Sequence, residues 1–282
     1  MRKRAYFLTT LAILIAMTFI GMPAFAADEF SRGEAVKLNV MSYNIHHAVG
    51  EDNVLDLERI AQIIKESNAD IIGLQEVDNH WSSRSDFQDQ AKWLADRLDM
   101  FYTYAANLDY EPLAEGDSRR QYGTAVLSKY PILDSENHSL PKIGNTEQRG
   151  LLETTINVKG THLHFYNTHL ALTSEERKLQ INKLVEITRQ ADGPKVIVGD
   201  LNATPKSEEM KQMYAHFADA FVDSNDAYTY SADNPSKRID YIFTSNEVKT
   251  DNAKVIGTQA SDHLPILTEL IIECNTPFEN GR

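Results

Sequence analysis

The chain has 282 residues, 42% of them hydrophobic and 24% charged, a composition typical of a globular protein that can bury a sizeable core. Its formal net charge of −13 argues against a long basic face for duplex DNA, although bound divalent cations can still bring a phosphate substrate into an acidic site. Its single cysteine, Cys274, excludes an internal disulfide, and with no histidine near it in the sequence we assign it no catalytic role.

The first 26 residues are typical of a secretory signal peptide. Three basic residues at 2–4 precede an apolar run at 11–22, and the sequence AFA at 24–26 supplies the small residues of a cleavage site. An uncleaved membrane anchor is the alternative, but the apolar run is shorter than the roughly 20 residues that a spanning helix needs. We therefore predict a secreted protein, periplasmic if the source has an outer membrane.

The remaining residues, 27–282, alternate apolar runs with amphipathic stretches, and no linker or repeat divides them. In chain order the patterns predict a strand at 37–45, a helix at 57–67, a strand at 70–77, a helix at 87–98, strands at 122–128, 151–158 and 161–170, a helix at 174–191 capped by Ser174, and strands at 195–202, 238–245, 254–259 and 265–272. We expect one domain with its core at about 36–272. Two sheets packed face to face with helices outside fit this order, and a doubly wound parallel sheet is the alternative.

Polar side chains stand at or near the ends of six predicted strands. They are Asn44, Glu76, Asn167 with His169, Asp200 with Asn202, Asp240, and Asp262 with His263. Each alone could be a turn former or a solvated end residue. Burying such groups without partners costs several kcal/mol each, however, and strand ends converge on one rim of a sheet. We therefore predict that these side chains gather in one cleft.

The chemistry of this set points to metal-assisted hydrolysis of a phosphate ester. Hard divalent ions such as Mg²⁺ take oxygen ligands, which Asn44, Glu76 and Asp262 could supply. A histidine oriented by a carboxylate can take a proton from water, and amide and imidazole donors can neutralise charge on a phosphoryl group. The three features together describe such a hydrolase.

The same residues carry a family resemblance. The segments SYNI (42–45), LQEV (74–77), NTHL (167–170), GDLNATP (199–205), RIDYIF (238–243) and SDHLP (261–265) occur in this order. From about Val36 to Leu270 the chain resembles the endonuclease/exonuclease/phosphatase superfamily, which has the DNase I-like fold. The resemblance implies a four-layered α/β sandwich, in which two mixed β-sheets pack face to face with helices outside. It also implies Mg²⁺-dependent phosphoester hydrolysis, with Mn²⁺ or Ca²⁺ as alternative ions.

The resemblance also implies a role for each position. The catalytic residues would be His169, Asp200, Asn202, Asp240 and His263, and the metal residues would be Asn44, Glu76 and Asp262, with Glu76 the principal ligand. His169 would contact the phosphate, while Asp200 and Asn202 would position the attacking water. Asp240 would orient His263. The general base stays open between Asp200 and the Asp240–His263 pair.

Three further residues are candidates for substrate binding. Arg149 occupies a position where relatives often carry Arg, with a surface ion pair as the alternative. His47 could line the cleft or be a loop histidine without a role. Thr124 stands where many relatives have Asn, so that its hydroxyl would have to replace an amide contact. His162 and His164 alternate along one strand face and read as packed or half-exposed side chains.

The substrate is the least determined feature. We expect an exported phosphodiesterase that acts on a small or lipid-headgroup phosphodiester, and the alternative is an extracellular nuclease that degrades DNA or RNA. A non-enzymatic binding protein is disfavoured because every expected catalytic position is filled. Besides the phosphate-ester substrate we expect only transient contact with a membrane surface or nucleic acid, no stable protein partner, and a monomer.

Overall fold

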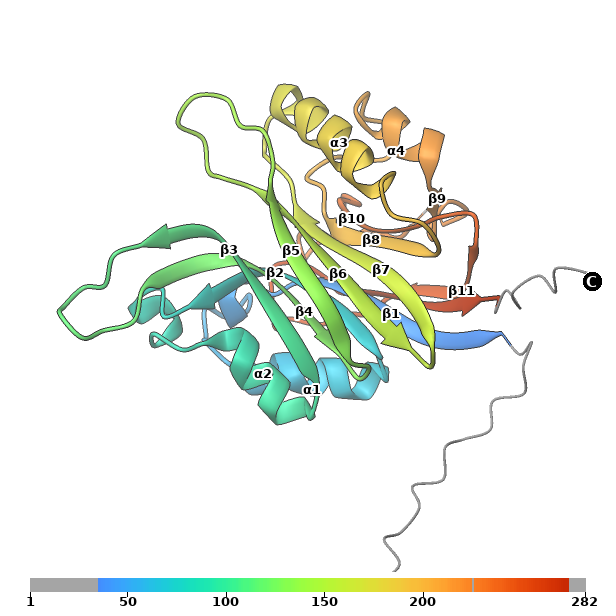
Figure 1. Ribbon diagram of the computed structural model, residues 1–282. Coiled ribbons are helices and arrows are strands. Elements are labelled where there is room, and N and C mark those ends of the chain that lie inside the picture. Colours follow the sequence, from blue (N-terminus) through green and yellow to red (C-terminus); the bar gives the residue numbers. More distant parts are fainter. Residues whose placement is uncertain (1–34, 225, 274–282) are drawn as a thin grey trace, which may run out of the picture. The chain divides into compact units, whose positions relative to one another are not determined.

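Two six-stranded β-sheets lie against each other in the computed structural model, which describes residues 35–224 and 226–273 (Figure 1). These residues belong to one compact unit. The predicted signal peptide, residues 1–26, and Cys274 lie outside the described residues. No helix in the described part of the chain is both long enough and apolar enough to cross a membrane.

The first sheet contains both ends of the described chain. Its order is β11 (Val248–Val255), β12 (Ile266–Ile272), β1 (Val36–Asn44), β2 (Ile71–Asn79), β4 (Arg120–Ser128) and β3 (Phe101–Tyr110). Only β1 and β2 pair in parallel, and the other neighbours are antiparallel, so this sheet is mixed.

The second sheet is built from the middle of the chain. Its order is β5 (Ile132–Ser139), β6 (Gly150–Val158), β7 (Thr161–His169), β8 (Lys195–Asp200), β10 (Asp240–Thr244) and β9 (Ala218–Asp219). Here β7 and β8 form the single parallel pair. Each parallel pair is joined by a crossover that contains a helix, as parallel strands require.

Helices cover the outer face of each sheet (Figure 1). The helices α1 (Leu57–Ser67) and α2 (Gln90–Leu98) pack on the first sheet, and α3 (Ser174–Thr188) and α4 (Met210–His216) pack on the second. The four layers therefore form the predicted DNase I-like α/β sandwich with two mixed sheets.

Alternation along the strands divides the core into three layers. In β1, Leu38 and Val40 belong to the layer between the sheets, whereas Met41 and Tyr43 pack under α1 and α2. Successive side chains of a strand point to opposite faces, so a strand buried on both faces has no polar alternation. This explains why the central strands read as continuous apolar runs.

The two sheets approach closely at Gly73 of β2. A Cβ atom at this position would lie 2.3 Å from Cγ2 of Val198 in the second sheet. Nearby, Asn167 Nδ2 donates hydrogen bonds of 2.8 Å to the carbonyl oxygens of Leu74 and Ala125, and its Oδ1 accepts one of 2.7 Å from Gln75. A buried amide on the second sheet therefore ties the backbone of the first sheet to it.

Several predicted boundaries were wrong. The helix predicted at 87–98 begins at Gln90, because the Asp89 side chain accepts a hydrogen bond from the backbone nitrogen of Lys92 and caps it there. Ser174 does not cap α3: Thr173 is the N-cap residue, and the Ser174 hydroxyl donates to Glu209 instead. The strand predicted at 254–259 ends at Val255 and begins earlier, at Val248, where it pairs with β12.

Candidate active site

The predicted polar residues come together where strands of both sheets end. Parallel pairing places Asn44 beside Gln75 in the first sheet and His169 beside Asp200 in the second. Antiparallel pairing then sets Asp240 opposite Asp200. A hydrogen bond of 3.2 Å from Asn44 Nδ2 to Asp200 Oδ2 joins the two groups across the sandwich.

Asp200, Asp240 and His263 form a buried charged group at the centre. Nδ1 of His263 lies 2.9 Å from Oδ2 of Asp240, and its Nε2 lies 3.5 Å from Oδ2 of Asp200. Each of the three residues is at most 4% exposed. As predicted, the partner of His263 is Asp240 rather than its sequence neighbour Asp262.

Burial and charge shift the acidity of this group in a definite direction. Burial alone would lower the pKa of His263, but Asp240 and Asp200 outweigh it and raise that pKa to about 10. Burial also raises the pKa of Asp200, an effect that the His263 charge partly offsets and the Asp240 charge reinforces. In the absence of a bound cation, His263 is therefore the protonated partner at neutral pH, and Asp200 is the carboxylate most ready to accept a proton.

His169 and Asn202 form a second pair beside Asp200. Asn202 Nδ2 lies 3.1 Å from Nε2 of His169 and 3.0 Å from the carbonyl oxygen of Leu170, while its backbone nitrogen donates to Asp200 Oδ1 at 2.8 Å. Burial, together with the charges of Arg149 and His263, lowers the pKa of His169 well below its usual value. His169 is thus a neutral imidazole held at the edge of the charged group.

Glu76 reaches the site from a β-bulge in β2. Leu74 pairs with Ala125 and Val77 with Gly123, so two residues of β2, Gln75 and Glu76, stand opposite the single residue Thr124. Glu76 has a backbone φ of 57°, in the left-handed region, and its Oε1 accepts a hydrogen bond of 3.0 Å from Asn44 Nδ2. The bulge thus interrupts the alternation of β2 side chains between the two faces of the sheet, and the Glu76 carboxylate turns toward Asn44.

The hydroxyl of Thr124 is buried and has no hydrogen-bond partner among the described residues. Its position opposite the bulge places it beside Glu76, where a substrate group could satisfy it. Its role in substrate binding stays a prediction.

Asp262, like Glu76, is partly exposed, whereas Asn44 is fully buried. The side chain of Asp262 is 30% exposed, and Oδ1 lies 3.8 Å from Nδ1 of His46. The neighbouring Ser261 is fully buried; its hydroxyl donates to the carbonyl oxygen of Asn44 at 2.7 Å and accepts from the backbone nitrogen of His263 at 3.2 Å. Ser261 therefore fixes the SDHLP segment to the end of β1.

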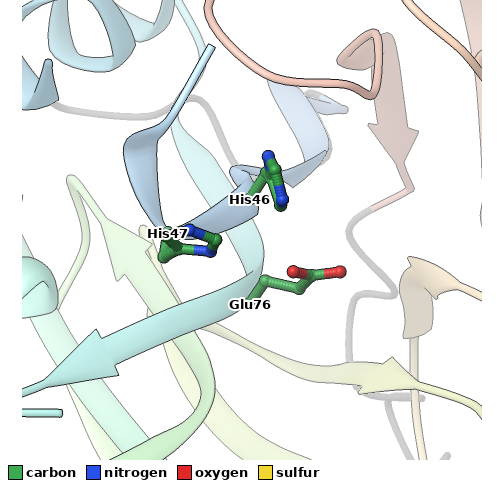
Figure 2. Close-up of side chains that lie close together, drawn as sticks. All are labelled: His46, His47 and Glu76. Atoms are coloured by element: carbon green, nitrogen blue, oxygen red, sulfur yellow. The ribbon is translucent and has the colours of Figure 1, made fainter. Parts of the chain in front are cut away.

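His47 lies in the short 3₁₀ turn His46–Ala48 that follows β1, next to Glu76 (Figure 2). Burial, reinforced by the charges of Arg84 and His46, lowers the pKa of His47 to about 3. Its imidazole is therefore neutral at physiological pH. Gln90 holds the turn by donating a hydrogen bond of 2.8 Å to the His47 carbonyl oxygen.

Arg149 is a buried residue rather than a surface one. Its side chain is 8% exposed, and Nη1 lies 2.9 Å from Oε1 of the exposed Glu147. Because its positive charge contributes to the lowered pKa of His169, it lies within electrostatic reach of the charged group. A contact to substrate phosphate stays a prediction.

An aromatic and cationic cluster borders the site. The Trp81 ring lies 5.4 Å from that of Tyr110 and 5.8 Å from that of Tyr122, and the guanidinium of Arg84 stacks over Trp81 and Tyr122. Two hydrogen bonds from Arg84 to the fully buried Asp78 hold it in place. Burial raises the pKa of Tyr122, and the charge of Glu76 adds to this rise, which places the cluster next to the metal residues.

The donor set fits a divalent cation. Glu76 and Asp262 supply hard oxygen donors and keep part of their carboxylates free for an ion. Asn44 turns its Nδ2 toward Glu76 and Asp200, and its Oδ1 accepts from the backbone nitrogen of His46, so it would have to rotate its amide to bind an ion. Two groups among the described residues bring potential ligand atoms within 4.8 Å of one another: His46 with His47 and Glu76, and Asp200 with Asp240 and His263. The second of these is largely occupied by its own internal hydrogen bonding and charge pairing.

Some residues of the site escaped the sequence reasoning. Ser261, Gln75 and Asp78 are buried and position the predicted side chains, and the Tyr230 ring lies 4.8 Å from that of His263. Ser261 and Gln75 stand directly beside Asp262 and Glu76 in the segments SDHLP and LQEV. Their positions in these segments could have identified them as residues of the site. Tyr230 belongs to no such motif.

Comparison with known proteins agrees with this geometry. The model of the endonuclease/exonuclease/phosphatase family matches residues 41–263. The chain belongs to this family. Members of the endonuclease/exonuclease/phosphatase family are hydrolases of phosphoester bonds, so the fold described above is that of a phosphoesterase.

Individual relatives span most of the chain. It is 28% identical over 252 residues to the uncharacterized protein YbhP of Escherichia coli K12, which covers 82% of this chain and 95% of that protein. The structure of a family member from Beutenbergia cavernae is similar with a TM-score of 0.71 and 25% identity, covering 84% of this chain and 72% of that one. The mannosyl-6-phosphatase Bt3783 of Bacteroides thetaiotaomicron shares the fold, with a TM-score of 0.66, 20% identity, and coverage of 83% and 99% respectively.

Proposed function

We propose that this protein is an exported, Mg²⁺-dependent phosphodiesterase that acts on a small or lipid-headgroup phosphodiester. The observation that carries the proposal is the convergence on Asp200 Oδ2. Asn44 Nδ2 lies 3.2 Å from this atom, and the Nε2 atoms of His169 and His263 each lie 3.5 Å from it. A buried carboxylate that accepts from the Asn44 amide and faces the protonated His263, with the neutral His169 beside it, is suited to general acid–base chemistry at a phosphate.

The acidities assign different roles to the two candidates for the base. Asp200, whose pKa is raised by burial, takes the proton of the attacking water. His263, kept protonated by Asp240, donates to a phosphoryl oxygen on which negative charge develops. Neutral His169 is held by Asn202: its Nε2 accepts from the Asn202 amide, so the ring proton is on Nδ1, and the imidazole stays uncharged beside Asp200.

A divalent cation bound by Glu76, Asn44 and Asp262 would act as a Lewis acid on the phosphoryl group. The exposed part of Asp262 and the bulged Glu76 are the groups that leave room for such an ion. We include export in the proposal because residues 2–26 have the pattern of a signal peptide. We further propose a monomer that makes transient contact with a membrane surface or nucleic acid.

A nuclease is the second candidate, and one observation favours it. Trp81, Tyr110 and Tyr122 with Arg84 form a cluster that could stack a base, and Arg120 lies over the Tyr110 ring. Stacking on such rings is worth about 1–3 kcal/mol per base. The net charge of −13 opposes this function, because a polyanion gains most of its affinity from basic contacts.

A substrate panel separates these functions. Purified protein with MgCl₂ is tested on bis-p-nitrophenyl phosphate, glycerophosphodiesters, sugar monophosphates including mannose 6-phosphate, plasmid DNA and RNA. Turnover of small diesters with intact nucleic acids supports the phosphodiesterase, and rapid nicking of plasmid supports the nuclease. Turnover of sugar monophosphates alone would overturn both.

Two variants make the panel specific for this site. His263→Ala should abolish turnover of whichever substrate is found, whereas His162→Ala, at an exposed position of β7, should leave it unchanged. Equal activity of the two variants would show that the measured hydrolysis belongs to a contaminant.

A further inference from the structure

His46, His47 and Glu76 form a group whose nitrogen donors the proposed hydrolysis does not use (Figure 2). One potential ligand atom from each residue lies within 4.8 Å of the other two. Tetrahedral ligands about 2.1 Å from a metal are about 3.4 Å apart, so small side-chain rotations would close this group around an ion. Glu76 is shared with the predicted oxygen site, and the two imidazoles are not.

His46 is oriented as a metal ligand is. Its Nδ1 lies 3.0 Å from the carbonyl oxygen of Val49. A carbonyl oxygen can only accept, so Nδ1 carries the proton and Nε2 keeps a free lone pair. Histidines that bind metals characteristically donate their other ring nitrogen to a carbonyl or carboxylate in this way.

His47 offers an unused nitrogen. Its Nδ1 is buried and has no hydrogen-bond partner among the described residues. Leaving a buried polar atom unpaired costs about 1–3 kcal/mol, and a bound ion would remove this cost. The ring centroids of His46 and His47 are 4.4 Å apart, so both imidazoles can reach a common point.

The backbone at all three donors is in an unfavourable region. The φ angles are 44° at His46, 43° at His47 and 57° at Glu76, where non-glycine residues are uncommon. Such conformations persist only where the surrounding structure imposes them, and they concentrate at functional sites. Here the strain brings together two imidazoles from the turn after β1 and one carboxylate from β2.

The chemistry of the donors selects the ion. Mg²⁺ prefers oxygen ligands, whereas imidazole suits Zn²⁺ and its neighbours in the first transition series. We propose that His46, His47 and Glu76 form a binding site for a divalent transition-metal ion of the Zn²⁺ class. Three protein ligands leave a further position for water or a substrate oxygen. The site uses a carboxylate of the proposed active site, but its existence does not depend on hydrolysis.

Metal binding without substrate tests the site. The full protein is stripped with a chelator, and Zn²⁺ and Mg²⁺ affinities are measured by calorimetry, with Co²⁺ added separately as a spectroscopic substitute for Zn²⁺. After Co²⁺ is added, we expect absorption bands in the visible range that are typical of Co²⁺ bound by nitrogen ligands. In His46→Gln/His47→Gln, Zn²⁺ affinity should fall by about 100-fold or more, because even the outer-shell partners of metal ligands contribute about 10- to 100-fold, while Mg²⁺ affinity changes less than about twofold.

Control variants distinguish this proposal from its neighbours. His162→Gln/His164→Gln removes two imidazoles from β7 and should leave both affinities unchanged. Glu76→Gln should weaken both ions. Unchanged Zn²⁺ affinity in the His46/His47 variant, or an equal loss for Zn²⁺ and Mg²⁺, would overturn the proposal. If the double variant does not fold, the Zn²⁺ affinity of His47→Gln and the Co²⁺ spectrum of the wild type test the site instead. A spectrum without nitrogen ligation then counts against it.

A protein that binds Zn²⁺ as described but hydrolyses no phosphoester refutes only the proposed function.

Discussion

Oδ2 of Asp240, at the start of β10 in the second sheet, lies 2.9 Å from Nδ1 of His263. His263 comes 23 positions later in the chain, in the loop that leads into β12 of the first sheet. Both side chains are almost fully buried. The fold therefore sets the protonation state of His263, and the first two predictions depend on this contact.

The first prediction concerns Asp240→Asn. The amide keeps the shape but removes the charge that holds His263 protonated, so kcat/KM should fall by about 10²–10⁴ while the fold is retained. Steady-state kinetics and circular dichroism measure the two effects. Asp219→Asn serves as the control, because Asp219 is a buried carboxylate of the same sheet that pairs with Arg238 instead. An Asp240→Asn enzyme of undiminished activity would contradict the role of this pair.

The second prediction concerns stability and pH in the metal-free protein. The pKa of His263 is raised from 6.5 to about 10 in the folded state, so between these values the folded protein binds more protons than the unfolded one. Its contribution to stability is complete below about pH 6.5 and is lost as the pH rises toward 10. The free energy of unfolding, from urea titrations with chelator at pH 7 to 9.5, should therefore fall more steeply for wild type than for His263→Asn. Parallel curves would disprove this.

The third prediction separates the two interpretations of Arg149. If Arg149 contacts substrate phosphate, Arg149→Gln should lower kcat/KM about 10- to 100-fold, because charge-assisted hydrogen bonds contribute about 1.5–3 kcal/mol. Glu147→Gln removes the ion-pair partner but leaves the guanidinium in place, so its activity should stay within about threefold of wild type. Similar, small effects of both variants would indicate that the residue only forms an ion pair.

The fourth prediction concerns the connection between the sheets. Asn167→Leu removes three buried hydrogen bonds, two to the carbonyl oxygens of Leu74 and Ala125 and one from the Gln75 amide. We expect the free energy of unfolding to fall by about 3 kcal/mol or more, measured by urea denaturation. The matched control is Asn157→Ala, which removes one exposed hydrogen bond from the Gly160 backbone nitrogen to Asn157 Oδ1 and should cost well under about 1.5 kcal/mol. Equal losses would show that Asn167 does not tie the sheets together.

Much of the fold could be predicted because its central strands are buried on both faces. Apolar runs predicted β1, β2, β8 and β12 nearly to their ends, strand-like alternation predicted β6 and β7, and the amphipathic spacing of 57–67 matches α1 at both ends. The edge strands β3 and β5 were missed, since most of their side chains are exposed or half-buried and carry no such pattern. The seven-residue α4 is too short for its periodicity to be seen.

The candidate site could be predicted as a set of residues but not as an arrangement. Order and residue type were enough to collect Asn44, Glu76, Asp200 and His263, because strand ends meet at one rim. The bulge that turns Glu76 and the buried hydroxyl of Ser261 depend on pairing between strands distant in sequence. Pattern along one strand contains no information about its partner's register, so these features required the structure.

The tie at Asn167 has a consequence for how the activity can be controlled. The site draws Asn44 and Glu76 from the first sheet, Asp262 from the loop before β12 of that sheet, and Asp200 and Asp240 from the second sheet, so neither half of the sandwich contains a complete set. A ligand or substitution that shifts one sheet relative to the other by about 3 Å, the length of a hydrogen bond, would separate these residues. Hydrolysis would then stop while both sheets stay folded. Loss of activity would then report a change in the relative position of the two sheets.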